Sequence, residues 1–196
     1  LQADLLEEAA TETLLPRAAE ALGGPITCLV NNASIFEYDD ITSATRESWD
    51  RHMGSNLRAP FVLTQAMVGQ GLKPEKDQNG EPRAAGLIVN MLDQRVRNLT
   101  PEFTTYTIAK MGMSLCTLGM SQEFAEDGIA VNSLWPLTAI DTAAVRNVLG
   151  GDAVSKGSRT VQIMADSAYE ILTRPSGECT GNFFVDEVLL RDAGVT

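Results

Sequence analysis

Tyr106 and Lys110 stand four residues apart in the stretch FTTYTIAK, and Asp93 lies thirteen residues before the tyrosine. On a helix, side chains at positions i and i+4 share one face, with their Cβ atoms about 5–6 Å apart. A phenol titrates at a pH of about 10, and a neighbouring ammonium favours the phenolate and lowers that pKa. The spacing therefore predicts a Tyr106–Lys110 pair in which the phenol exchanges a proton with a substrate near neutral pH. The alternative is an ordinary surface pair on a helix.

Asp93 changes what this pair would do. A carboxylate close to Tyr106 would raise the pKa of the phenol and oppose the effect of Lys110, unless Asp93 is itself protonated or paired. A simple Tyr–Lys proton transfer is therefore not expected beside Asp93.

The segments that must position these side chains follow two periodicities. Short apolar runs predict four strands, namely ITCLV, GLIVNML, IAVNSLW and NFFVD. Helical spacing of apolar residues predicts helices over 5–22, 45–71, 103–127, 139–149 and 159–173. Strands that alternate with such helices predict parallel βαβ units with right-handed crossovers, and hence an α/β fold with a doubly wound parallel sheet.

Ligands of such sheets bind beyond the carboxyl ends of the strands. The segments 31–36, 90–94 and 135–142 each follow a predicted strand, so they are the segments expected to surround a ligand.

The composition narrows the class of protein. The 196 residues are 44% hydrophobic and show no shift in composition, which predicts one domain. A net charge of −11 argues against nucleic acid or an anionic membrane surface as a partner, because like charges repel. The three cysteines are far apart and have no metal-ligand spacing, which predicts no metal site and reduced thiols in a cytoplasmic compartment. No run is long and apolar enough to span a membrane.

Five motifs occur in the order found in the short-chain dehydrogenase/reductase family, which this sequence resembles over nearly its whole length: LVNNAS, SNLRAPF, GLIVNMLD, YTIAK and IAVNSLWP. The resemblance implies a Rossmann-like doubly wound sheet and an NAD(P)-dependent oxidoreductase. The family's first βαβ unit, with its glycine-rich TGxxxGxG turn, has no counterpart in this sequence. The chain starts on LQADLLEEAA, which reads as a strand end running into a helix. We therefore expect residues 1–196 to be a single domain of this family that is N-terminally truncated.

The resemblance also implies roles for particular residues. Tyr106 would be the proton donor, Lys110 would tune it and hold the nicotinamide ribose, and Asn56 would organise a proton relay through water. Asp4 matches the aspartate beside the adenine ring, a position that would otherwise be a helix N-cap. The remaining cofactor-binding positions are Asn31 and Ala33 over the adenosine ribose, and Pro136, Ile140 and Thr142 in the segment that closes over the nicotinamide carboxamide and the pyrophosphate.

The two halves of the sequence resemble branches with different substrates. Most members carry serine where this chain has Asp93, and the exchange resembles pteridine reductases, in which an Asp–Tyr–Lys set protonates a ring C=N bond. There Phe36 matches the aromatic residue that stacks on the pterin, Ser34 lies beside it, and Arg95 or Arg97 would meet an acidic substrate tail. The later stretches LWPLTAIDTAAVRNVLGG and TGNFFVDEVLL are more similar to the hydroxysteroid dehydrogenase-like branch, with residues 143–149 as a mobile lid.

The leading interpretation is an NADP(H)-dependent oxidoreductase that transfers hydride to a pterin-like C=N or a carbonyl carbon; NAD is possible, because the residue that selects the cofactor would precede Leu1. One alternative is an oxidoreductase of lipid or steroid-like carbonyls. The other is an inactive fragment or an oligomerising, non-catalytic homologue. The segments 45–71 and 103–127 match the helix pair at the family's dimer interface, which predicts a homodimer or homotetramer.

Overall fold

The computed structural model describes residues 1–38, 40–70, 86–91, 102–148 and 151–195. Four parallel strands form one sheet in the order β1-β2-β3-β4. The strands are β1 Cys28–Asn31, β2 Gly86–Met91, β3 Ile129–Trp135 and β4 Phe183–Val185. All four predicted strands are therefore present, although β1 and β4 are shorter than the apolar runs that predicted them.

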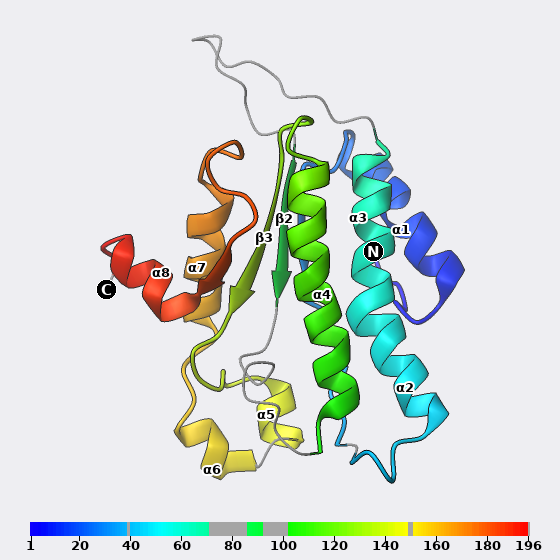
Figure 1. The fold of residues 1–196 in the computed structure, drawn as a ribbon, viewed down its shortest axis with the longest axis vertical. Coiled ribbons are helices and arrows are strands. Elements are labelled where there is room, and N and C mark those ends of the chain that lie inside the picture. Colours follow the sequence, from blue (N-terminus) through cyan, green and yellow to red (C-terminus); the bar gives the residue numbers. More distant parts are fainter. Residues whose placement is uncertain (39, 71–85, 92–101, 149–150, 196) are drawn as a thin grey trace.

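Helices precede, connect and follow these strands (Figure 1). Their bounds are α1 Glu8–Leu22, α2 Arg46–Met53, the π-helix η1 Gly54–Arg58, α3 Ala59–Val68, α4 Thr104–Glu123, α5 Ala143–Asn147, α6 Gly151–Lys156, α7 Gln162–Leu172 and α8 Asp186–Asp192. Local sequence explains several ends. Thr45 caps α2 through its side chain, and Gly23 ends α1 with a φ of 74°, a left-handed conformation that glycine adopts without a steric penalty.

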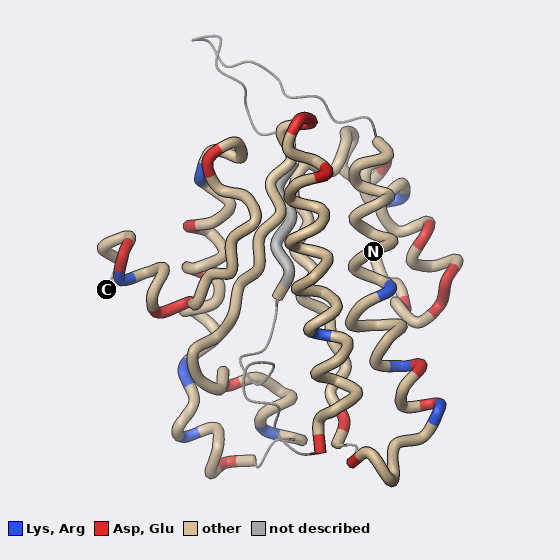
Figure 2. The backbone as a smooth tube through the Cα atoms, viewed as in Figure 1, with Lys and Arg blue, Asp and Glu red and all other residues tan. Residues whose placement is uncertain are grey.

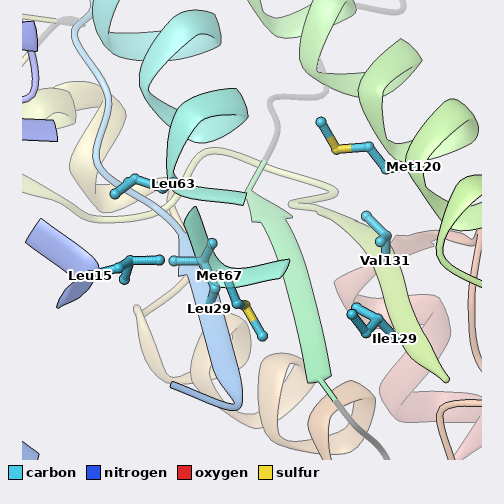
Figure 3. Packing of buried hydrophobic residues seen from close by; sticks show 7 residues of the cluster. All are labelled: Leu15, Leu29, Leu63, Met67, Met120, Ile129 and Val131. Atoms are coloured by element: carbon cyan, nitrogen blue, oxygen red, sulfur yellow. The ribbon is translucent and has the colours of Figure 1, made fainter. Parts of the chain in front are cut away.

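Alternation along β3 shows that helices cover both faces of the sheet. Ile129 and Val131 point to one face, where they pack with residues of α1, α3 and α4 (Figure 3). Leu134 points to the other face and packs with Ile171 of α7 and Leu189 of α8. Two apolar clusters therefore lie on opposite sides of one sheet, which confirms the predicted doubly wound α/β architecture.

The crossovers differ from the prediction at one point. The strand order steps in one direction throughout, and the connections through α3 and α4 pass over the same face. The connection from β3 to β4 returns through α7 on the opposite face, so its hand is opposite to that of the first two. A right-handed crossover everywhere was therefore the wrong prediction. Between β3 and α7 the chain forms α5 and α6 beyond the carboxyl edge of the sheet, and α7 then packs on the face opposite α4.

Candidate functional site

The carboxyl ends of the strands and the first turn of α4 meet at one edge of the sheet (Figure 1). The helix α4 runs antiparallel to the strands, so its N-terminal residues return to the edge where β2 ends. Tyr106 and Lys110 lie on its first two turns. The fold therefore places the predicted proton-transfer pair where α/β sheets bind their ligands.

The side chains of Tyr106 and Lys110 lie together, as the spacing predicts. The Lys110 Nζ is 5.7 Å from the centre of the Tyr106 ring, within the range of a cation–π contact. The same Nζ donates a hydrogen bond of 3.1 Å to the carbonyl of Met91, the last residue of β2. Only 6% of Tyr106 and 2% of Lys110 is exposed. A nearly buried ammonium therefore sits against the phenol ring and is fixed to the end of the neighbouring strand.

Aromatic side chains surround the Tyr106 ring. Phe36 meets it edge-on, with ring centres 4.8 Å apart and planes at 74°. Phe36 also packs on Phe103 at 4.9 Å, and Tyr38 completes the cluster. The structure therefore brings Phe36 to the predicted tyrosine. The Phe36 ring packs against three rings, those of Tyr106, Phe103 and Tyr38.

Asn56 fixes the segment that follows β1. It lies in the π-helix η1 and is fully buried. Its Oδ1 accepts hydrogen bonds from the Ile35 N–H at 2.8 Å and from the Ser34 hydroxyl at 3.1 Å, and its Nδ2 donates to the Ile35 carbonyl at 2.8 Å. π-Helical turns are often found at functional sites. In this structure Asn56 therefore holds the Ser34–Ile35 backbone, whereas its predicted part in a water relay stays a prediction.

A cavity of about 510 Å³ opens beside the Tyr106–Lys110 pair. The described residues that line it come from the ends of β1 and β2, the start of α4, the segment before α5 and the helix α7. They are mostly apolar, and Lys110 is the one charged residue among them; the lining comprises Val30, Asn32, Ser34, Met91, Tyr106, Lys110, Ile140, Thr142, Val161, Met164, Ala165 and Ala168. Phe36 and Pro136 are not among the described lining residues.

A second cleft of about 420 Å³ lies between the N-terminal segment and the loop after β1. It contains Asp4 and Ala33, both predicted at the adenosine end of the cofactor, together with Ser34. The Asp4 carboxylate accepts a hydrogen bond from the Leu6 N–H at 3.0 Å, but the residue at the N-cap of α1 is Glu7. The alternative prediction, that Asp4 is the N-cap of α1, is therefore wrong. Asp4 instead caps the turn that precedes α1, by accepting from the backbone N–H two residues after it.

The predicted closing segment after β3 carries a short helix. Thr142 caps α5 by accepting a hydrogen bond from the Val145 N–H, and Ile140 pairs with Arg159 in an isolated bridge. Asp141 binds Arg146 and Ser155, and these hydrogen bonds lower its pKa to about 2. Asp141 thereby links the predicted lid helix α5, through Arg146, to Ser155 of α6. The helix α5 ends at Asn147.

Two further predicted positions do not lie in the cavity wall. Asn31 is buried in β1, where its backbone pairs with Asn90. Pro136 is half-buried directly after β3. Asp93, Arg95 and Arg97 lie outside the described residues, so their predicted roles remain predictions.

Sequence reasoning missed His52. It is the one histidine of the chain and is fully buried at the end of α2, with its ring centre 6.2 Å from that of Tyr106. Its position four residues before Asn56, on the same helical face, is the signal that would have pointed to it. Within the part of the chain that the structure describes, no group of three or more potential metal ligands gathers, and no helix is long and apolar enough to cross a membrane.

A doubly wound parallel α/β sheet with a buried Tyr–Lys pair at its carboxyl edge places the chain in the class of Rossmann-like α/β proteins. Residues 1–151 match the family model described as short chain dehydrogenase, and the chain belongs to that family.

The chain is similar to curated and structurally characterised members of this class. It is 39% identical to hydroxysteroid dehydrogenase-like protein 2 of Xenopus tropicalis and 36% identical to that of Homo sapiens, in each case over 98% of this chain and 43% of the relative. Its fold matches a dehydrogenase structure from Xanthomonas campestris with a TM-score of 0.84 and 32% identity, over 100% of this chain and 68% of that one. A blue fluorescent protein from a metagenomic library, solved in complex with NADPH, matches with a TM-score of 0.76 and 26% identity, over 94% and 72%. The chain thus spans less than half of the curated relatives that it matches.

Proposed function

We propose that the protein is an NADP(H)-dependent oxidoreductase that reduces a carbonyl or C=N carbon, with Tyr106 as the proton donor. The observation that carries the proposal is the contact between the Lys110 ammonium and the Tyr106 ring at the wall of the 510 Å³ cavity. The relatives support the reaction class, because the curated ones are named hydroxysteroid dehydrogenase-like and one structural neighbour was solved in complex with NADPH.

The two clefts fit the two ends of a dinucleotide. Asp4 and Ala33 would contact the adenosine end, and Lys110, Ile140 and Thr142 the nicotinamide end. Ser34 lines both clefts, so the loop pinned by Asn56 would run alongside the cofactor. When bound, the cofactor supplies the hydride.

Tyr106 would provide the proton. Its O–H bond breaks as the substrate oxygen or nitrogen gains negative charge, and the proton forms the new O–H or N–H bond. The tyrosinate that remains is stabilised by the ammonium of Lys110, which Met91 orients through its carbonyl. The apolar walls exclude water and strengthen this electrostatic effect.

An apolar carbonyl compound is the favoured substrate class. The described cavity wall has one charged residue, and Phe36 packs on Tyr106, Phe103 and Tyr38 and does not line the cavity. The names of the hydroxysteroid dehydrogenase-like relatives point in the same direction. The pterin hypothesis rests on Asp93, which lies outside the described residues.

Tyr106→Phe tests the proposal. We expect kcat for reduction of a steroid-type ketone to fall by at least about 100-fold, because the proton donor is removed. NADPH binding, followed by its fluorescence, should persist. The matched control is Tyr169→Phe on α7, where the side chain is exposed and is not among the described residues that line the cavity, so activity should not change. An unimpaired Tyr106→Phe enzyme would overturn the assignment, and faster turnover of an oxidised pterin than of the ketone would reverse the order of the substrate classes.

We also propose that two copies pair through α3 and α4. The stretches 59–68 and 111–122 carry no charged residue, and Figure 2 shows the corresponding parts of α3 and α4 without the colours of charged residues. Exposed apolar residues follow one stripe of α4: Ile108, Met111, Leu115 and Leu118. A homodimer or homotetramer would bury this stripe. Cys28, Cys116 and Cys179 are free thiols, which suits a reducing, cytoplasmic compartment.

A further inference from the structure

His52 occupies the wall behind Tyr106. Its imidazole is 0% exposed, lies on α2, and meets the Tyr106 ring of α4 at 77°, with ring centres 6.2 Å apart. Phe36 contacts the same phenol ring edge-on. The Tyr106 ring is therefore in contact with a phenyl ring from the loop after β1 and with an imidazole from α2.

The imidazole is itself held in one orientation. Its Nδ1 lies 2.9 Å from the carbonyl of Ser48, one helical turn earlier, where it donates a hydrogen bond. The Ser48 hydroxyl donates to the Glu37 carboxylate at 3.2 Å, and Glu37 forms an ion pair with Arg51. The hydrogen bond from Arg51 lowers the pKa of Glu37, which keeps this acceptor charged. Polar contacts thus link His52, which packs on the Tyr106 ring, through Ser48 and Glu37 to Arg51 of α2.

A buried imidazole has an energetic cost that an aliphatic side chain at the same position would avoid, because its ring nitrogens lose their contacts with water. The chain places its single histidine at the position where α2 faces the proposed proton donor. A reacting group must be held within a fraction of an ångström of its productive position, and side chains behind it supply that support.

We propose that His52 is a positioning residue for Tyr106: its ring, packed against the phenol, keeps the phenol against Lys110. This inference rests on the proposed function of Tyr106. The described charged or titratable groups around the phenol are Lys110 from α4 and His52 from α2, with Glu37 and Arg51 one contact further out. Loss of the imidazole ring frees the phenol to swing away from the ammonium, and the phenolate then forms at higher pH.

Two variants separate the ring of His52 from its hydrogen bond. His52→Gln keeps a side-chain N–H donor, one bond further from Cβ than Nδ1, but loses the ring, and His52→Phe keeps an aromatic ring but loses the donor. We expect His52→Gln to lower kcat about tenfold while the dissociation constant of NADPH stays within about twofold, and His52→Phe to retain most of kcat. Phenolate absorbance, taken as the difference between each variant and the same variant carrying Tyr106→Phe, isolates the titration of Tyr106. The midpoint of this Tyr106 titration should shift upward by ~0.5–1 pH unit in His52→Gln and stay near the native value in His52→Phe.

Equal kcat and equal Tyr106 titration in the native protein and in His52→Gln would overturn the inference. Equal impairment of both variants would overturn it too, because the donor and not the ring would then matter. Thermal unfolding of each variant shows whether it is folded, and equal impairment counts against the inference when both variants unfold cooperatively. If Tyr106→Phe itself remains active, the proposed function fails; if Tyr106→Phe is inactive and His52→Gln is unaffected, only the role of His52 fails.

Discussion

Buried polar side chains at the edge of the sheet form hydrogen bonds that connect different elements. Lys110 ties α4 to the end of β2, and Asn56 ties the π-helix to the loop after β1. Each group is almost fully buried, so the hydrogen bonds compensate for the loss of contacts with water. Residues that the sequence marks as chemical therefore also define the shape of the site.

Asn56→Ala should destabilise the protein. The substitution leaves the Ile35 N–H and carbonyl without their partner, and each unsatisfied buried group costs about 1–3 kcal/mol. We expect a loss of about 2–4 kcal/mol in the free energy of unfolding, measured by urea denaturation at unchanged m-value. Ser34→Ala is the matched control, since it removes only the hydroxyl contacts of an exposed residue, with Asn56 and with the Ile35 carbonyl, and should cost less than about 1 kcal/mol. Similar losses in the two variants would contradict the role of Asn56.

At the scale of elements, α4 and η1 approach closely at Gly112. A Cβ built on Gly112 would lie 2.9 Å from Cδ2 of Leu57, whereas one built on Gly119 of the same helix would meet nothing within 4 Å. The absence of a side chain at Gly112 therefore permits the contact between the helix that carries Tyr106 and the π-helix that carries Asn56.

The two glycines provide a matched pair of substitutions. Gly119→Ala should stabilise the protein by ~0.5–1 kcal/mol, because alanine has the higher helix propensity. Gly112→Ala gains the same propensity but forces Leu57 to move, at a cost of ~1–3 kcal/mol. We expect Gly112→Ala to be the less stable variant by about 1 kcal/mol or more in denaturant unfolding. A Gly112→Ala protein as stable as Gly119→Ala would show that Leu57 adapts freely.

Element prediction from the sequence succeeded where apolar periodicity is strong and failed where geometry is decided by a single residue. The apolar runs located β2 and β3, and the spacing of Tyr106 and Lys110 predicted their contact. The π-helix was not predicted, because one extra residue in a turn hardly changes the apolar pattern of the 45–71 segment. The short helix α8 was also missed, although its acidic first turn, Asp186 and Glu187, is a helix-start signal.

At the scale of the whole molecule, neither the faces of the sheet nor the partners of an exposed surface can be read from the order of elements. Alternation along β3 assigns α7 to the face opposite α4, and this assignment needs coordinates. His52 was overlooked for the same reason: its neighbour Tyr106 is 54 positions away in the sequence, and only packing brings the two rings together.

The proposed pairing through α3 and α4 can be tested with one charge. Leu115 is 62% exposed in the middle of the α4 stripe, so Leu115→Glu places a carboxylate in the proposed interface and should dissociate the oligomer. Light scattering should give the mass of at least two chains for the native protein and a lower mass for the variant. Tyr169→Glu, at a 67% exposed position on α7, is the control and should leave the mass unchanged. A native protein with the mass of one chain would contradict the proposal.

Ser34 lines both clefts, and its hydroxyl donates a hydrogen bond to Asn56. The two clefts therefore share one residue of their walls. A molecule bound in one cleft would contact a residue that also lines the other. Fragments corresponding to the two ends of a dinucleotide should therefore not bind independently: the affinity of the second fragment depends on whether the first is present, although the two never touch.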